Sequence, residues 1–208
     1  EALDHTIGEK NIDANIVAHN WLGVAYHNLG QFKASVEELK TVLSLIPENR
    51  TYEFLGTPVI VSVNCKTWLI RGLAQIGNFN ETTRYGDEAI QTATEREHPL
   101  SIVFAYYAVG AVALIRGEFD KAITALEHGL KVCEAAEIPV QRPLVASGLA
   151  AAYASVGRFE EALRLLESQP ALSVWMPAAE SRRVPLGRSM GAAWEVETYM
   201  LTGKLSEA

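Results

Sequence analysis

The stretch HNWLGVAYHNLGQFKASVEELKTVLSLIP, residues 19–47, decides the fold. Within it, Gly30 stands between two helix-like stretches and is followed two residues later by the large apolar side chain of Phe32. The same motif occurs five times along the chain, as Gly30-x-Phe32, Gly77-x-Phe79, Gly117-x-Phe119, Gly157-x-Phe159 and Gly203-x-Leu205. The spacings between successive glycines are 47, 40, 40 and 46 residues. Such a period predicts an all-α fold of stacked helical hairpins, none of which can bury its apolar face alone.

The side chains of each repeat narrow the choice among helical repeats of similar length. The first repeat reads His19-x-x-Leu22-Gly23-x-x-Tyr26, then Gly30-x-Phe32, Leu39 and Pro47. This order follows the tetratricopeptide template W-x2-L-G-x2-Y…F…P, with histidine in place of tryptophan. Similar residues recur in the third and fourth repeats, at Tyr106, Val109, Gly110, Phe119, Ala122 and Leu126 and at Leu149, Tyr153, Phe159, Ala162 and Leu166. We therefore expect a tetratricopeptide-like right-handed superhelix of antiparallel helical hairpins, an α-solenoid.

The expected organisation is a single solenoid domain over residues 1–208. Its repeats are predicted at about residues 14–48, 57–97, 99–138, 142–169 and 185–208, the last one truncated. Residues 1–10 are expected to be the tail of a preceding helix, and residues 48–56 the longest ordered loop. We expect the chain to be an excerpt of a longer protein.

Glycine and proline positions predict local geometry. The five motif glycines are expected to close the first helix of each hairpin with a positive φ, while Gly23 and Gly110 let two helices approach closely. The second repeat has Ile70, Thr82 and Gly86 at positions that depart from the pattern, so we expect it to pack less regularly. Prolines 58, 99, 143 and 185 are expected in the first turn of inner helices of about five turns, with Thr57 as an N-cap.

Composition excludes several classes of function. A net charge of −7 without a basic stripe disfavours nucleic acid, which requires clustered Lys and Arg. The longest apolar run, residues 102–115, is too short to span a bilayer, so no membrane insertion is expected. Cys65 and Cys133 lie far apart without a CxxC partner, which favours a reducing compartment, and we expect a cytoplasmic protein.

Several phrases resemble one protein family. They are Glu97-His98-Pro99-Leu100, the run from Arg116 to Ile123, and Ile138-Pro139 before Ala150-Ala151-Ala152-Tyr153. They resemble the tetratricopeptide region near the C-terminus of bacterial multidomain class III adenylate cyclases, in which a cyclase domain and an AAA-type ATPase domain come first. The resemblance implies a protein-interaction and regulatory module in signal transduction. Related signalling ATPases, or the sensor region of maltose-operon activators, are alternatives, and these imply a small-molecule sensor.

No catalytic chemistry is predicted for this segment. Gly203-Lys204-Leu205 lacks both the upstream glycine and the hydroxyl residue of a nucleotide-binding P-loop. The five histidines show no HExxH or cysteine-paired spacing, and no nucleophile elbow occurs, so we expect no cofactor, no metal site and no hydrolase activity. Of the histidines, His19 is expected in the core and His27 as a polar group of the groove.

The inner helices are expected to line a concave binding groove. Alignment on the closing glycines predicts as contact residues Asn20, His27, Thr67, Arg71, Gln75, Phe104, Tyr107, Ala111, Ser147, Ala151 and Glu197. Arg71 is the one cation in this row, so a carboxylate clamp is not expected, and its alternative role is an ion pair with a neighbouring carboxylate. The small-molecule alternative would use Asn20, His27, Arg71 and Gln75.

An apolar strip is expected at the far end of this groove. It would consist of Phe104, Tyr107, Ala108, Ala111, Leu114, Gly148, Ala151 and Ala154. We predict that it receives a helix from a protein partner or from another domain of the parent chain, unless the curvature of the stack already buries it. Trp21, Trp68 and Trp194 are interpreted as packing residues, either at the groove edge or in the contact between hairpins, and Trp175 as a groove plug. Self-association through the uncapped ends is a further hypothesis.

Overall fold

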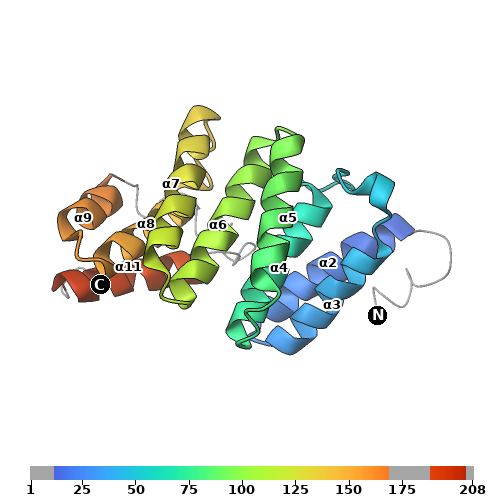
Figure 1. The fold of residues 1–208 in the computed structure, drawn as a ribbon, viewed down its shortest axis with the longest axis horizontal. Helices are drawn as coiled ribbons and strands as arrows, with labels where there is room; N and C mark the ends of the chain where they lie inside the picture. Colours follow the sequence, from blue (N-terminus) through green and yellow to red (C-terminus); the bar gives the residue numbers. More distant parts are fainter. Residues whose placement is uncertain (1–11, 169–187, 205–208) are drawn as a thin grey trace, which may run out of the picture. The chain divides into compact units, whose positions relative to one another are not determined.

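A computed structural model describes residues 12–168 and 188–204 of the chain. These residues form α-helices and one short 3-10 helix, and no strand occurs among them (Figure 1). The chain divides into two compact parts, Glu1–Val109 and Gly110–Ala208, with the boundary inside one helix. We call them the N-terminal part and the C-terminal part and describe each by itself.

The N-terminal part consists of two and a half hairpins. Its elements are α2 (Ile12–Asn28), α3 (Phe32–Leu45), η1 (Glu48–Arg50), α4 (Val61–Gln75), α5 (Thr82–Glu95) and the first eleven residues of α6 (Pro99–Ile115). Helix α4 packs against α2, α3 and α5, so it is surrounded on most sides. Nearly all of its side chains are buried as a result, including Leu69, Ile70 and Leu73 in the core.

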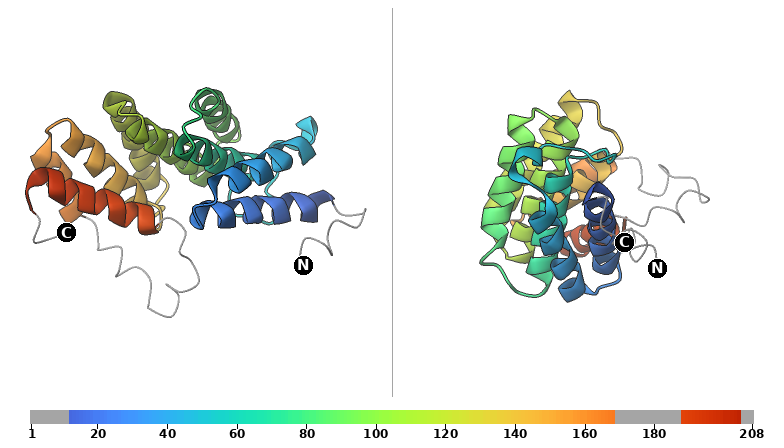
Figure 2. Two further views of the ribbon diagram at one scale, coloured as in Figure 1. Left: turned by 90° about the horizontal axis from the view of Figure 1, so that it is seen from below. Right: turned by 90° about the vertical axis from the view of Figure 1, so that its right-hand side faces the viewer.

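The C-terminal part continues the same alternation. Its elements are the rest of α6, α7 (Phe119–Ala135), α8 (Arg142–Ser155), α9 (Phe159–Glu167) and α11 (Arg188–Thr202). Helix α8 is the central element, because α7, α9 and α11 all pack against it. Figure 2 shows α11, in red, alongside the orange helices of this part.

The five motif glycines close the inner helices as predicted. Their φ angles lie between +71° and +80°, at Gly30, Gly77, Gly117, Gly157 and Gly203. In every case the amide after the glycine donates a 2.9 Å hydrogen bond back into the last helical turn, for example Gln31 to the Tyr26 carbonyl. This is the hydrogen bond of a Schellman cap, which requires a left-handed residue at the glycine position.

Close approach at Gly23 and Gly110 is also confirmed. A Cβ placed on Gly23 would lie 2.7 Å from Cγ of Leu39, and one on Gly110 only 2.5 Å from Cγ of Leu126. Each glycine therefore makes the room that a leucine of the second helix fills.

The second repeat keeps this pairing with its partners exchanged. Ile70 occupies the position of Gly23, and Gly86 occupies the position of Leu39. A Cβ on Gly86 would meet Cδ1 of Ile70 at 3.7 Å and Cγ2 of Val109 at 2.9 Å. The large residue thus comes from the inner helix and the small one from the outer helix. The expectation of irregular packing in this repeat is wrong at these positions, because one exchange compensates for the other.

The prolines fit the prediction in part. Pro99 is the first residue of α6 and Pro143 lies in the first turn of α8, as expected. Pro58 and Thr57 precede α4, whose N-cap is Ile60, so their predicted roles are wrong. The Thr57 hydroxyl instead lies within hydrogen-bonding distance of the Phe54 and Val59 carbonyls, at 2.8 and 2.5 Å, which makes it part of a turn. The inner helices have 14 to 17 residues, or about four to five turns.

The connection between α3 and α4 is longer than predicted. It runs over residues 46–60 and contains η1 and several turns. Residues 1–10 and Pro185, for which we made predictions, lie outside the described residues. No helix in the described ranges has both the length and the apolar character needed to cross a bilayer.

Candidate functional site

The predicted contact residues are mostly buried. Eight have at most 8% of their surface exposed, namely Asn20, His27, Thr67, Arg71, Tyr107, Ala111, Ser147 and Ala151. Phe104 is half-buried, while Gln75 and Glu197 are exposed. The expectation that all of them line an open groove is therefore wrong for these eight. Thr67 and Arg71 in α4, like Ser147 and Ala151 in α8, are buried because three other helices pack around each of these two helices.

A polar cluster occupies the inner helices of the N-terminal part. The Asn20 side-chain amide donates to Oδ1 of Asn64 at 2.9 Å, between α2 and α4. The Thr67 hydroxyl donates to the Asn64 carbonyl at 2.8 Å within α4. Asn64 was not predicted from the sequence, although it lies three residues before Thr67 and seven before Arg71, on one helix face. The cluster fixes α2 against α4 by a buried side-chain hydrogen bond.

Arg71 lies beside this cluster, against aromatic rings. Its guanidinium carbon is 4.1 Å from the centroid of the Trp68 ring and 5.7 Å from that of Tyr107. Burial lowers the pKa of Arg71, and the nearby Tyr107 opposes that shift. Cation–π contact over a buried tryptophan is one of the stronger forms of this interaction. The prediction that Trp68 is a packing residue is confirmed, since it is 6% exposed.

His27 is a neutral histidine packed among aromatic rings. Its ring makes edge contacts with Phe32 and Trp68, at centroid distances of 5.2 and 5.1 Å. Burial, together with the charge of Arg71, lowers the pKa of His27 to about 3. An uncharged imidazole at neutral pH suits a site beside a guanidinium, because a second positive charge would be repelled.

Other predicted roles are partly corrected. His19 is half-buried, and its Nδ1 lies 2.6 Å from Oε2 of Glu38, so it links α2 to α3 at the surface edge and is not a core residue. Trp21 is 44% exposed, so it is not buried between hairpins, and its place at a groove edge stays a prediction. Trp194 is half-buried. Trp175 lies outside the described residues.

The expected apolar strip offers little exposed surface. Ala108 is 1% exposed and Leu114 is 8% exposed, while Ala111 and Ala151 have no exposed surface. For Ala151, the reason is that α8 is enclosed by α7, α9 and α11. The prediction of an exposed strip is therefore wrong at these residues, where the alternative of a strip that is already buried holds.

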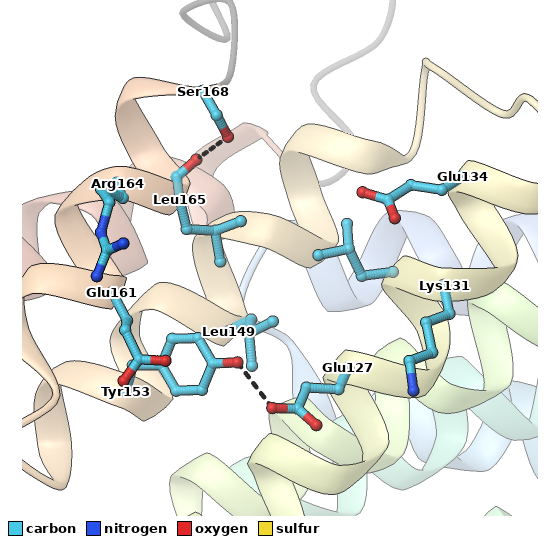
Figure 3. Close-up of a pocket in the computed structure, with 10 residues that line it drawn as sticks. Glu127, Lys131, Glu134, Leu149, Tyr153, Glu161, Arg164, Leu165 and Ser168 are labelled. Atoms are coloured by element: carbon cyan, nitrogen blue, oxygen red, sulfur yellow. Dashed lines mark hydrogen bonds between the residues drawn. The ribbon is translucent and has the colours of Figure 1, made fainter.

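A surface groove lies elsewhere, between the outer helices of the C-terminal part. It has a volume of about 580 Å³, with walls from α7 and α9 and a floor from α8 (Figure 3). Its lining residues are Glu127, Leu130, Lys131, Glu134, Leu149, Tyr153, Glu161, Arg164, Leu165 and Ser168. We call this the α7–α9 groove. Its floor is apolar and its rims are charged, a combination typical of a binding surface.

Tyr153 is the polar anchor of this groove. Its hydroxyl donates to Oε1 of Glu127 at 2.7 Å, and the centroid of its ring lies 3.9 Å from the guanidinium carbon of Arg158. Burial and the bond to Glu127 raise the pKa of Tyr153 to about 12. The phenol therefore stays protonated and holds the Glu127 carboxylate in one orientation. This groove was not predicted from the sequence, because the predicted contact residues all lie on inner helices and two of its walls are outer helices.

The described residues hold no group of three His, Cys, Asp or Glu side chains placed to bind a metal ion. Both cysteines are buried thiols. Burial raises the pKa of Cys133 to about 11 and raises that of Cys65 further, so neither is a reactive thiolate at neutral pH.

Comparison with known proteins gives both sequence and structural matches. Residues 16–49 and residues 143–168 each match a tetratricopeptide repeat model. A crystal structure of nearly identical TPR-like repeats, from a Podosopora anserina protein described as a putative kinesin light chain, superimposes with a TM-score of 0.62. It shares 20% sequence identity and covers 96% of this chain and 91% of its own.

A crystal structure of a variant form of the same repeats gives a TM-score of 0.63 at 20% identity, covering 95% of this chain and 91% of that one. No curated protein matches the sequence. At this level of sequence identity, the structural similarity supports a shared fold and nothing further. The chain thus carries tetratricopeptide repeats at residues 16–49 and 143–168, and its fold is a tetratricopeptide-like α-solenoid.

Proposed function

We propose that this chain is a non-catalytic protein-interaction module that regulates a linked bacterial signalling protein of the class III adenylate cyclase type. The observation that carries the proposal is the pair of tetratricopeptide segments, at residues 16–49 and 143–168. Tetratricopeptide repeats generally mediate contacts between proteins, through surfaces that stacked hairpins present. The resemblance of residues 97–100 and 116–123 to the cyclase family supports the signalling context, and with it a cytoplasmic location.

Exposure to solvent indicates which of the predicted groove residues can contact a partner. Gln75, at the end of α4, and the half-buried Phe104 keep surface in the N-terminal part, as Glu197 does in the C-terminal part. We assign direct contact with a protein partner, or with another domain of the parent chain, to these three. The buried Asn20 and Arg71 then act by fixing the inner helices in position.

The test is to assay the protein encoded by the complete open reading frame that contains this chain. We expect it to make cyclic AMP, at a rate that changes several-fold when residues 12–204 are deleted, while the isolated chain makes none. Gln75→Glu combined with Phe104→Ala should change the regulated rate at least twofold. Lys33→Glu, at an exposed position of α3, is the control. A reading frame without a cyclase domain refutes the cyclase assignment.

The buried polar cluster favours a second candidate, a small-molecule sensor. Asn20 and Asn64 share a buried hydrogen bond, and on the same face of α4 the Arg71 guanidinium lies over the Trp68 ring, so amide and guanidinium groups able to bind a polar ligand lie on these inner helices. A metabolite that binds the folded chain raises its unfolding temperature with concentration. This candidate expects at least one such shift in a metabolite panel, lost on Asn64→Ala. A panel without any shift refutes it.

A further inference from the structure

The outer helices of the N-terminal part are joined by an ion pair at defined repeat positions. Lys40 lies ten residues after the closing glycine Gly30, and Glu81 lies four residues after Gly77. The Lys40 ammonium is 2.9 Å from Oε1 of Glu81, so it reaches from α3 to the start of α5. A lysine of one outer helix thus meets a carboxylate of the next hairpin, across the inner helix α4 that lies between them in the chain.

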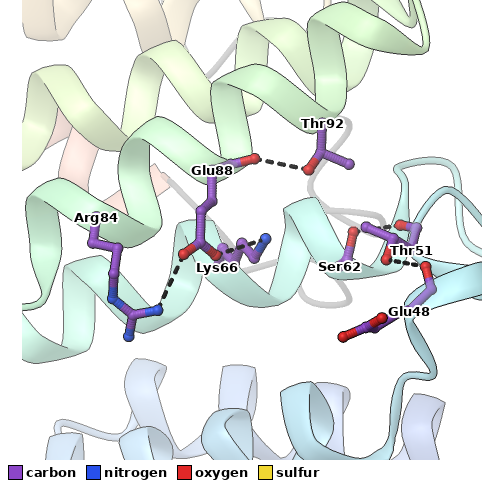
Figure 4. A network of polar contacts seen from close by, with 7 residues as sticks. All are labelled: Glu48, Thr51, Ser62, Lys66, Arg84, Glu88 and Thr92. Carbon is purple, nitrogen blue, oxygen red and sulfur yellow. Dashed lines mark hydrogen bonds and ion pairs between the residues drawn. The ribbon is translucent and has the colours of Figure 1, made fainter.

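A second lysine, on the inner helix α4, forms an ion pair with a carboxylate of α5. Lys66 of α4 lies 3.0 Å from Oε2 of Glu88 on α5, and Arg84 lies 3.1 Å from the other oxygen of that carboxylate (Figure 4). Lys66 stands eleven residues before Gly77 and Glu88 eleven residues after it. Lys40 and Glu81 therefore join neighbouring hairpins, whereas Lys66 and Glu88 pair within the second hairpin.

The corresponding positions of the α7–α9 groove carry different residues. Ten residues after Gly117 stands Glu127, and four residues after Gly157 stands Glu161, so the Lys–Glu pair is replaced by two carboxylates. The positions of Lys66 and Glu88 are taken by Ala146 and Ser168. Glu127 accepts a hydrogen bond from Tyr153, and Glu161 pairs at 2.6 Å with Arg158 of its own hairpin. Arg158 also attracts Glu127 electrostatically, but among the described residues Glu127 has no ion pair like that between Lys40 and Glu81.

The groove is also large enough to hold part of a ligand. Its volume is about 580 Å³, and its apolar lining residues are Leu130, Leu149 and Leu165. Figure 3 shows Leu149 and Leu165 among the residues that line it. The lining residues on α7 extend from Glu127 to Glu134, about two helical turns or ~10 Å along the axis. This length matches two turns of a helix laid into the groove, which is a common mode of peptide recognition.

We propose that the α7–α9 groove binds a short amphipathic helix of a partner protein that directs a lysine or arginine at Glu127 and Glu161. The partner's cation takes the place that Lys40 has in the N-terminal part, and its leucine-like side chains cover Leu130, Leu149 and Leu165. Lys131 and Arg164, on the two rims, favour an acidic residue at the edge of the same helix. The inference rests on the proposed role in protein binding and is independent of the cyclase assignment.

The test is selection of a phage-displayed library of random 12-residue peptides on the wild-type chain, with counter-selection on Glu127→Lys. That variant restores the residue type of Lys40 and should close the groove through an ion pair with Glu161. We expect the selected peptides to carry Lys or Arg beside leucine-like residues at helical spacing. Synthetic copies, measured by fluorescence anisotropy, should bind Glu127→Lys about tenfold more weakly than wild type.

Matched variants separate the groove from general charge effects. Asp120→Lys makes the same charge change at an exposed position of α7 outside the groove lining, and should leave affinity unchanged. Glu127→Gln keeps an acceptor for Tyr153 and should weaken binding less than Glu127→Lys, while a peptide with its Lys changed to Glu should lose binding. Selected peptides without a basic residue, or equal affinity for wild type and Glu127→Lys, overturn the inference. Equal affinity for the two forms would exclude the α7–α9 groove as the binding site, but it would not contradict protein binding elsewhere on the chain.

Discussion

The contact between Gly110 and Leu126 allows a sharp test of the packing. In the Gly110→Ala variant the new Cβ would lie 2.5 Å from Cγ of Leu126 and 2.8 and 3.2 Å from its two methyl carbons. Leu126 has no exposed surface, so it has no free space into which to move. The clash therefore falls on a side chain that is held on all sides.

Two effects of opposite sign decide the magnitude. Alanine is favoured over glycine in a helix interior by about 1 kcal/mol, which alone would stabilise α6. Overpacking of a filled core costs about 1–3 kcal/mol, and a contact as short as 2.5 Å places this site at the upper end. We expect a net loss of about 1–2 kcal/mol in the free energy of unfolding.

The decisive measurement is a double-mutant cycle by urea denaturation followed by circular dichroism. Leu126→Ala alone should cost about 2–5 kcal/mol, since it leaves a cavity. In that background Gly110→Ala should become stabilising by about 0.5–1 kcal/mol, because the clash is gone and the helix preference remains. The coupling energy should thus be about 2 kcal/mol. Additive effects of the two substitutions would refute the proposed contact.

Three further perturbations test other features. Gly117→Ala introduces no clash but forces a side chain to φ +71°, so it should cost about 1–2 kcal/mol in urea denaturation, and a neutral result contradicts the capping role. The pKa of the buried His27 is about 3 in the folded state, so below pH 6.5 this histidine takes up a proton when the chain unfolds. The free energy of unfolding should therefore fall by about 2 kcal/mol between pH 7 and pH 5. His27→Gln should reduce this dependence on pH. Tyr153→Phe removes the hydrogen bond to Glu127 and should cost about 1 kcal/mol, whereas an unchanged urea midpoint would show that the bond contributes nothing.

The backbone geometry was the most predictable part of the molecule. A glycine at a helix end that must adopt positive φ leaves a direct mark in the sequence, so all five closing glycines were predicted correctly. Pro99 and Pro143 were predictable for a similar reason, because proline suits the first helical turn. Pro58 was not, since a proline in a bend before a helix gives the same local pattern.

Burial was less predictable, because it depends on how many neighbours a helix has. The helical period correctly gives the face shared by Thr67 and Arg71, but it cannot tell that α2, α3 and α5 all pack around α4. Ala151 in α8 was mispredicted in the same way. The α7–α9 groove depends on which outer helices are neighbours and which residues they bring together, so no single sequence motif indicates it.

Packing residues and surface charges differ between the repeats in separate ways, and the free-energy costs of changing them explain why. When Gly23 and Leu39 become Ile70 and Gly86, the exchange is reciprocal, because a clash or a cavity in the core costs several kcal/mol. When Lys40 and Glu81 become Glu127 and Glu161, no lysine appears in exchange at either position. A half-exposed ion pair contributes only about 0.2–1 kcal/mol, so its loss does not threaten the fold. Surface positions of this kind can therefore vary to suit a binding partner, while the packing pairs hold the hairpins together. This difference explains why specificity for a basic helix can reside in the α7–α9 groove and not in the buried inner helices.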